Sequence, residues 1–150
     1  MWRSKWILLA LLVCSCGGTT EGPTIANDAS LVVTIVSSSP RLVSGEPVTL
    51  TVAVENRSDS LVTFGSGSSS CQLVSFVVVD DRMALIPVDR VCTTDAAPYR
   101  LAAGQRRSES WQWTGEALIG NERKMLAPGT YAVYGGAGEF RSPQLLIEIE

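Results

Sequence analysis

The sequence predicts an all-β protein, an Ig-like antiparallel β-sandwich of about seven to eight strands. Three observations indicate this fold class. From residue 31 onward the dominant hydrophobic period is two, which is typical of half-buried strands. Turn-forming residues separate the strand-like runs. Only residues 116–125 could form a short helical turn, and Gly120 weakens that interpretation.

The expected strands follow one another along the chain. In VTLTVAV (48–54) the valines and the leucine point to one face and the threonines to the other, which predicts one buried face. LVSFVVV (73–79) is apolar on both faces, which predicts a central strand. Pro87 indicates that the predicted strand at residues 83–88 lies at the edge of a sheet or contains a bulge. The predicted strands cover residues 31–36, 48–54, 61–64, 73–79, 83–88, 110–114, 130–136 and 144–150.

Aromatic residues in the C-terminal half narrow the architecture. LAPGTY (126–131) resembles the tyrosine corner of Greek-key sandwiches, in which a tyrosine hydroxyl bonds to upstream backbone. The alternative is a plain turn before an aromatic core residue. Trp111 and Trp113 share one face of an expected strand, and a pair at this spacing favours the core over a ligand platform.

The N-terminus has the pattern of a bacterial lipoprotein signal peptide. Two basic residues precede an apolar stretch that is too short to cross a bilayer. VCSC (13–16) then resembles a lipobox, whose last cysteine receives the lipid. Cys16 is the preferred attachment site, because choosing Cys14 would place a branched valine before the cleavage point. The alternative is an ordinary signal peptide in which both cysteines are incidental.

The chain is therefore expected to have three parts. Residues 1–15 form the signal peptide, residues 16–30 a lipid-anchored flexible linker, and residues 31–150 the β-sandwich domain. A flexible linker of this length spans about 20 Å. The lipid on Cys16 would attach the protein to a membrane of the bacterial cell envelope. Gly17 stands where many inner-membrane lipoproteins carry aspartate, which favours the outer membrane, facing the periplasm.

Cys71 and Cys92 are the cysteines that remain after signal cleavage. An exported bacterial domain lies in an oxidising compartment, so we expect them to form a disulfide. The alternatives are two buried thiols or a reactive centre, but no C-x-x-C redox motif supports the latter.

The sequence contains no recognisable catalytic machinery. Histidine is absent, and no nucleophile elbow, Walker loop or zinc pattern occurs. Asp80, Asp81 and Asp89 could gather calcium, but they lack the spacing of a calcium loop, so a solvated turn is preferred. The formal net charge of −3 and the absence of a basic stripe argue against nucleic acid. We expect no cofactor, no metal and no enzyme activity, although a carboxylate pair remains an alternative without positive support.

The domain resembles the BsuPI-type intracellular proteinase inhibitor domain. The matching pieces are VTLTVAVENRSDSLVTF (48–64), SFVVVDD (75–81), LAAGQRRSESWQW (101–113) and LAPGTYAVYG (126–135). This resemblance implies an Ig-like fold and binding to a protease. ALIPVD (84–89) replaces the aromatic segment of that family, and the lipobox contradicts an intracellular location. Nothing identifies an inhibitory loop, so no inhibitory residue is carried over.

We therefore expect a non-catalytic module that binds a protein, with a protease as the named candidate. The alternative is a structural or assembly accessory of the envelope. Loops at the ends of a sandwich commonly carry binding residues, and the flexible loops were expected at residues 56–60, 65–70 and 135–141. The best-equipped side chains are those of Arg57, Asp59, Phe140 and Arg141. A rigid exposed loop would favour inhibition, whereas an apolar patch or an open sheet edge would favour an accessory role.

Replacing Cys16 by serine should release the protein from the membrane fraction, whereas Cys14→Ser should leave it there. The reason is that only the cysteine after the small residue fits the lipobox. Fractionation with labelled fatty acid checks both variants. Label retained on Cys16→Ser would contradict the assignment.

Overall fold

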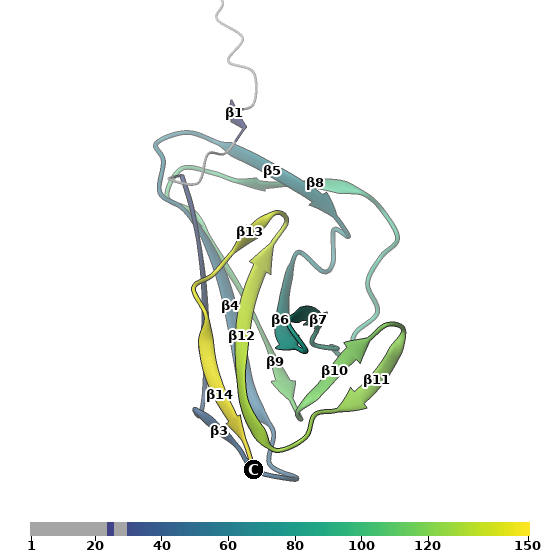
Figure 1. Cartoon of the computed structure of the whole chain (residues 1–150). Coiled ribbons are helices and arrows are strands. Elements are labelled where there is room, and N and C mark those ends of the chain that lie inside the picture. The colour runs from purple at the N-terminus through teal and green to yellow at the C-terminus, as the bar shows by residue number, and fades with distance from the viewer. Residues whose placement is uncertain (1–23, 26–29) are drawn as a thin grey trace, which may run out of the picture.

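The computed structural model describes residues 24–25 and 30–150, and in that part of the chain every regular element is a β-strand (Figure 1). This confirms the all-β prediction. The described residues form 14 strands, more than the expected seven to eight, because three two-residue strands, a strand at residues 97–101 and a hairpin at residues 116–125 were not predicted. The strands are β1 (Thr24–Ile25), β2 (Leu31–Ser37), β3 (Arg41–Leu42), β4 (Val48–Asn56), β5 (Val62–Gly67), β6 (Leu73–Val79), β7 (Arg82–Leu85), β8 (Ala97–Leu101), β9 (Arg106–Trp113), β10 (Glu116–Ile119), β11 (Glu122–Met125), β12 (Gly129–Ala137), β13 (Phe140–Arg141) and β14 (Leu145–Ile149).

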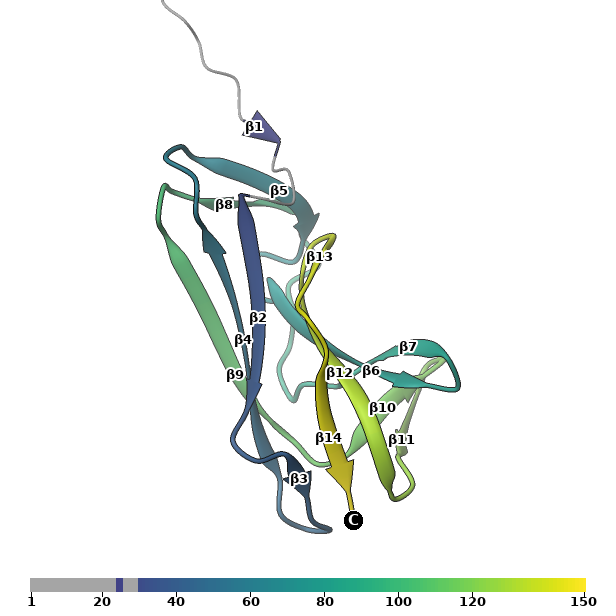
Figure 2. The same cartoon turned by 60° about the vertical axis from the view of Figure 1, so that its left-hand side comes forward.

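Two main sheets pack as a sandwich, and a smaller sheet lies across one end (Figures 1 and 2). The first main sheet has the order β2-β4-β9. The second has the order β11-β10-β7-β6-β12-β14-β3, with β13 paired to β12. The small sheet has the order β1-β5-β8. In Ig terms, β2, β4 and β9 occupy positions A, B and E, and β6, β12 and β14 occupy C, F and G, which confirms the Ig-like prediction.

Strand β4 forms the centre of the first sheet, paired antiparallel with β2 and with β9. Its inward side chains, Val48, Leu50, Val52 and Val54, are at most 3% exposed. The threonines between them are half-buried on the outer face. The alternation seen in the sequence is therefore confirmed, and it supplies one wall of the core.

Strand β12 passes close to β4 at Gly135. A Cβ atom on Gly135 would lie 2.9 Å from Cγ1 of Val52 and 3.3 Å from Cβ of Ile35. Both distances are shorter than ordinary contacts between carbon atoms. Val133 faces the same way and is fully buried, in one core cluster with Trp113. Glycine at position 135 therefore lets the two sheets pack directly against each other.

The aromatic predictions are confirmed. The hydroxyl of Tyr131 donates to the carbonyl of Ala127 at 2.8 Å, which forms the tyrosine corner before β12. Trp113 is 1% exposed, so it belongs to the core. Trp111 packs against both core clusters, and its Nε1 donates to Ser75 Oγ at 3.1 Å, which joins the two sheets. Neither tryptophan is a surface platform.

Asn56 organises the end of the sandwich beside the small sheet. Its side chain is fully buried, and Nδ2 donates to the carbonyls of Ser60, Leu101 and Ala102 at 2.8–3.0 Å. Its Oδ1 accepts from the backbone N–H of Ser58 at 3.0 Å. One side chain thus satisfies backbone groups of two neighbouring turns, which would be costly to bury without hydrogen bonds.

The expected helical turn at residues 116–125 is wrong, because this segment is the β10–β11 hairpin. Gly120 has a φ of +66° and lies in the two-residue turn with Asn121. A left-handed turn of this type matches the twist of paired strands, so the glycine initiates a hairpin instead of weakening a helix.

The small sheet differs from the expectation in three places. Residues 65–67 were expected in a flexible loop, but they belong to β5, which pairs with β8 through a register shift after Phe64. Strand β8 itself was not expected. Strand β1 lies in the segment assigned to the linker and pairs parallel with β5. Pairing with a neighbouring strand therefore orders segments whose own sequences have weak strand propensity.

Replacing Gly135 by alanine should lower the free energy of unfolding by about 1–3 kcal/mol, because the new methyl group overpacks the core at Val52. The control is Gly135→Ala combined with Val52→Ala, which removes the side-chain atoms that the new methyl group would meet. The double variant should lose less free energy of unfolding than the sum of the two single losses. Urea unfolding of the three variants measures this, and additive losses would contradict the packing assignment.

Candidate protein-binding surface

The outer faces of the two main sheets have different chemistry. The outer face of β2-β4-β9 is largely polar, and its hydroxyl groups bond to one another across the strands. Thr51 Oγ1 and Ser110 Oγ are 2.8 Å apart, and Gln112 Nε2 donates to Thr49 Oγ1 at 3.0 Å. Its apolar members include Val32 and Val36 of β2 and Ala53 of β4. This sheet therefore has the solvated outer face that is usual for antiparallel sandwiches.

The outer face of the second sheet carries an apolar area over its central strands, which we call the outer patch, whereas Thr130 and the Arg41–Glu148 ion pair lie on the same face towards the edge. Alternation along each strand directs these side chains away from the core. Met83 and Leu146 are 50% and 53% exposed, and the other members are partly exposed. The outer patch consists of Val74, Phe76, Val78, Met83, Leu85, Leu118, Ala132, Tyr134 and Leu146.

Strand register arranges the outer patch in rows. Tyr134 pairs with Phe76, which pairs with Leu85, so these three side chains form one row across β12, β6 and β7. Two residues further along the strands, Val78 pairs with Met83 on β6 and β7. In the same direction Ala132 pairs with Leu146 on β12 and β14. The patch is thus continuous over four strands.

Gly136 allows one charged side chain to lie on the outer patch. It pairs with Arg141 of β13, and a Cβ atom here would lie 2.9 Å from the Phe76 ring and 3.1 Å from Arg141 Nη1. The Arg141 guanidinium crosses β12 at this gap and lies 4.7 Å from the centre of the Phe76 ring. Its Nη1 donates to the carbonyls of Gly138 and Phe140 at 2.7 and 2.8 Å. The arginine is therefore held in place by a cation–π contact and two hydrogen bonds.

The opposite end of the outer patch carries two carboxylates. Asp80 and Asp81 form the β6–β7 turn with φ values of 49° and 60°, a left-handed conformation that aspartate tolerates better than most residues. Both are exposed, and neither has an ion-pair or hydrogen-bond partner in the described part of the chain. The preferred interpretation, a solvated turn, agrees with this arrangement.

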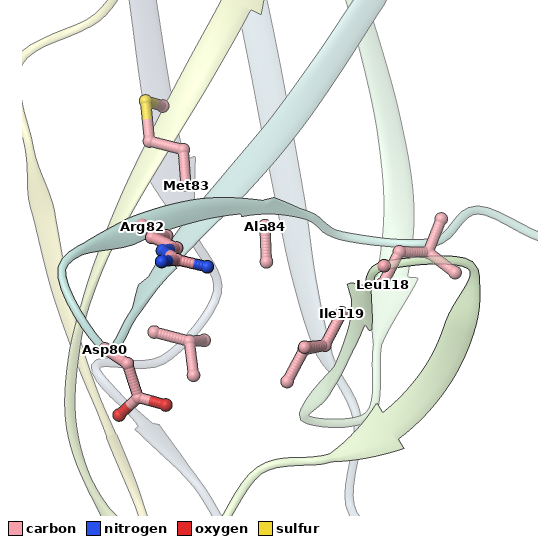
Figure 3. Close-up of a pocket in the computed structure, with 8 residues that line it drawn as sticks. Asp80, Arg82, Met83, Ala84, Leu118 and Ile119 are labelled. Carbon is pink, nitrogen blue, oxygen red and sulfur yellow. The ribbon is translucent and has the colours of Figure 1, made fainter.

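A pocket of about 400 Å³ lies beside this turn (Figure 3). It forms because β10 pairs with β7 at one position only, Leu118 with Leu85, and then diverges. Asp80 and Arg82 lie on one side of the opening and Ile119 on the other. The volume is in the range of ligand pockets, about 300–1,000 Å³. Its charged lining residues are one carboxylate, Asp80, and one guanidinium, Arg82, which stays protonated, so the lining shows no general acid–base pair.

The binding residues expected on the loops are placed separately. Arg57 is exposed in the β4–β5 turn, where its Nε lies 3.3 Å from Glu55 Oε1, and Asp59 is exposed beside it. Phe140 is half-buried, with its ring centre 5.8 Å from that of Phe64 in the core. The structure therefore does not bring the four side chains into one site: Phe140 serves packing, and Arg141 lies on the outer patch.

The sequence did not predict that the residues of the outer patch are exposed together on one face of a sheet. LVSFVVV (73–79) was interpreted as a central strand, because both of its faces are apolar. Strand β6 is central in its sheet, but no described element covers its outer face. The exposed Met83 and Leu146 lie on neighbouring strands that only the three-dimensional register identifies.

Cys71 and Cys92 form the predicted disulfide, with Cα atoms 5.5 Å apart. It fastens the connection between β7 and β8 to the start of β6. Arg90 on this connection donates to the Leu73 carbonyl at 3.1 Å and lies 5.9 Å from the Trp111 ring. It also forms an ion pair with Glu109 of β9. The connection thus closes the side of the sandwich between β6 and β9.

Hydroxyl groups gather beside the disulfide but have no activating base. The Thr93 backbone N–H donates to Ser70 Oγ at 2.8 Å, and Ser68 Oγ is 2.9 Å from Thr93 Oγ1. Hydrogen bonds from Thr93 and Ser69 lower the pKa of the Asp95 carboxyl group. A carboxylate with a lowered pKa is a weaker base. The hydrogen bonds of this cluster hold the loop at residues 68–70 to the connection between β7 and β8.

Residues 24–25 and 30–150 contain no group of three or more potential metal ligands. None of the described segments is a helix long and apolar enough to cross a membrane. Cys16, the expected site of lipid attachment, lies outside the described residues, as do Cys14 and the expected signal peptide.

Neither a family model nor a curated protein matches the sequence. Similar solved structures include the β-glucosidase from Listeria innocua in complex with isofagomine (16% identity, TM-score 0.48, 79% of this chain). A β-glucosidase from Erythrobacter marinus is similar over 81% of this chain (10% identity, TM-score 0.48). The alkylpurine DNA glycosylase from Pseudomonas fluorescens bound to DNA has 15% identity and a TM-score of 0.46 over 81% of this chain. This chain covers only 16%, 15% and 30% of those chains, so the likeness carries no functional inference.

Replacing both Cys71 and Cys92 by alanine should lower the free energy of unfolding by about 3 kcal/mol, because the crosslink no longer restricts the unfolded chain. Urea unfolding of the variant and the oxidised wild type measures the loss. Thiol titration of the oxidised, denatured domain is the control, and two reactive thiols would contradict the disulfide.

Proposed function

We propose that this protein is a lipid-anchored bacterial envelope protein that works as a non-catalytic protein-binding module. The observation that carries the proposal is the contrast between the two outer faces. One sheet has a polar outer face with its own hydrogen bonds, whereas the other exposes the outer patch. A continuous apolar patch on a soluble domain marks a surface that a partner covers.

The outer patch has the features of a preformed protein interface. Strand pairing fixes the backbone of β6 and β12 over five consecutive residue pairs, so little order would be lost on binding. Phe76, Tyr134 and Arg141 are of the residue types that dominate interface hot spots. Arg141 is already held by two hydrogen bonds.

The anchor part of the proposal rests on the lipobox at residues 13–16. The described domain begins at the end that carries the small sheet (Figure 1). The outer patch lies along the side of the sandwich and not on that end. A domain anchored from that end would leave the patch open to other envelope components.

Two forms of binding are distinguished by the surface. An exposed apolar patch favours an assembly accessory, which holds other components in place. The β4–β5 turn at residues 57–60 is short and bound by Asn56, and residues 138–139 form a tight turn between β12 and β13. Neither turn extends from the domain as an inhibitory loop would. Protease inhibition is the second candidate and rests on the BsuPI-type resemblance.

Photo-crosslinking in intact envelopes tests the binding surface. A benzophenone amino acid at Met83 or Leu146 should form crosslinks to protein, whereas the same probe at Thr34 or Ser110 on the polar face should not. Equal crosslinking from both faces, or none from the outer patch, would contradict the proposal.

Inhibition has a separate test. The protein should block a serine protease near a one-to-one ratio if it is an inhibitor. Subtilisin-like and envelope proteases that keep full activity at micromolar concentrations of the protein would remove this candidate and leave the accessory role.

A further inference from the structure

We infer that the partner for which the outer patch is built is a second copy of this chain, packed face to face about a two-fold axis that runs across the strands. This inference rests on the proposed function, because it assumes that the outer patch is a binding surface. It names the occupant from three observations: the charges at the two ends of the patch, the sizes of its side chains, and its area.

The two ends of the outer patch carry opposite net charges, and Arg141, Asp80 and Asp81 have no ion-pair partner. Arg141 lies over Phe76 at one end. Asp80 and Asp81 lie at the other end of β6, four residues or about 13 Å beyond Phe76, and with the adjacent Arg82 they leave that end with one net negative charge. In residues 24–25 and 30–150 neither the arginine nor the two aspartates form an ion pair, although twelve other charged side chains do.

A two-fold axis that lies between the facing sheets and runs across the strands exchanges these two ends. Arg141 of one copy then faces the Asp80–Asp81 turn of the other, and the second pair forms by symmetry. An axis along the strands would instead bring like charges to the same end. Charge complementarity therefore selects one orientation, and it does so twice in each dimer.

The side chains match in size under the same symmetry. The axis passes between the row of Tyr134 and Phe76 and the row of Ala132 and Val78, which lie on the same two strands. Each aromatic ring of one copy then faces the smaller side chain of the other: Tyr134 faces Ala132, and Phe76 faces Val78. Large residues opposite small ones interdigitate, as packed sheets require.

The area of the outer patch limits how tightly two copies of the chain can associate. Four strands about 4.8 Å apart and three rows about 6.8 Å apart cover about 400 Å² on each copy. The total of about 800 Å² is in the range of weak, transient interfaces. We therefore expect a weak, reversible dimer with a Kd of about 0.1–1 mM.

Sedimentation equilibrium of the full chain in density-matched detergent measures this association. The wild type should pass from monomer to dimer with rising concentration. Met83→Glu with Leu146→Glu should weaken the association at least tenfold, because two charges would be buried at the apolar centre. Arg106→Asp is the control, since Arg106 lies on the other sheet and has no ion-pair partner in the described part of the chain.

A charge exchange tests the orientation of the two copies. Arg141→Glu alone should weaken the dimer about tenfold, and Arg141→Glu combined with Asp81→Lys should restore it to within about threefold of the wild type. Asp80→Asn with Asp81→Asn should also weaken it, and asparagine keeps the left-handed turn if lysine does not. Thermal melting by circular dichroism shows that each variant is folded.

The outcomes separate this inference from the proposed function. A chain that stays monomeric up to about 1 mM, or a dimer that is insensitive to the Arg141 and patch variants, overturns the second-copy inference. If the probe at Met83 nevertheless crosslinks to a different protein, the binding function stands with another occupant. If the chain is monomeric and the probe crosslinks to nothing, both fail.

Discussion

The contact between β12 and β4 at Gly135 is the constraint on which the rest of the domain depends. Because no side chain stands between the strands, Val52 and Ile35 pack directly on the β12 backbone. The neighbouring position on β6 is Ser75, whose hydroxyl accepts from Trp111 across the sandwich. A larger residue at 135 would separate the sheets where this partly buried hydrogen bond crosses, and would weaken the bond that joins them.

The next residue along β12 is also a glycine, and its missing side chain allows a close approach on the opposite face of the sheet. Gly136 leaves room for the Phe76 ring and for Arg141 to cross the strand, so a cation lies flat on the outer patch. Two adjacent glycines therefore set both the thickness of the core and the shape of the outer patch. This link explains why the candidate surface lies over the best-packed part of the sandwich and not on a loop: the strands that bury the core also fix the surface.

The sequence predicts those parts of the fold that depend on local patterns. Alternation located β4, turn residues preceded Tyr131, and the cysteine count paired Cys71 with Cys92. The sequence does not predict the segments whose conformation depends on which strand or side chain they contact in the folded protein. Gly120 was weighed as a helix breaker, although in a hairpin it is a turn former. The candidate surface was sought on loops, and Phe140 was placed there, because sequence spacing does not show that its ring reaches Phe64.

A sheet face suits a binding module with no catalytic group for physical reasons. Recognition by loops orders flexible backbone and gives up part of the interaction energy, whereas a face fixed by strand pairing is already in its bound conformation. Such a face is limited in another way, since it is exposed before the partner arrives and favours non-specific association. Charges at its ends restrict which partners fit, as Arg141 and the Asp80–Asp81 turn do here. The apolar rows would then supply affinity, and the two charged ends would supply the orientation.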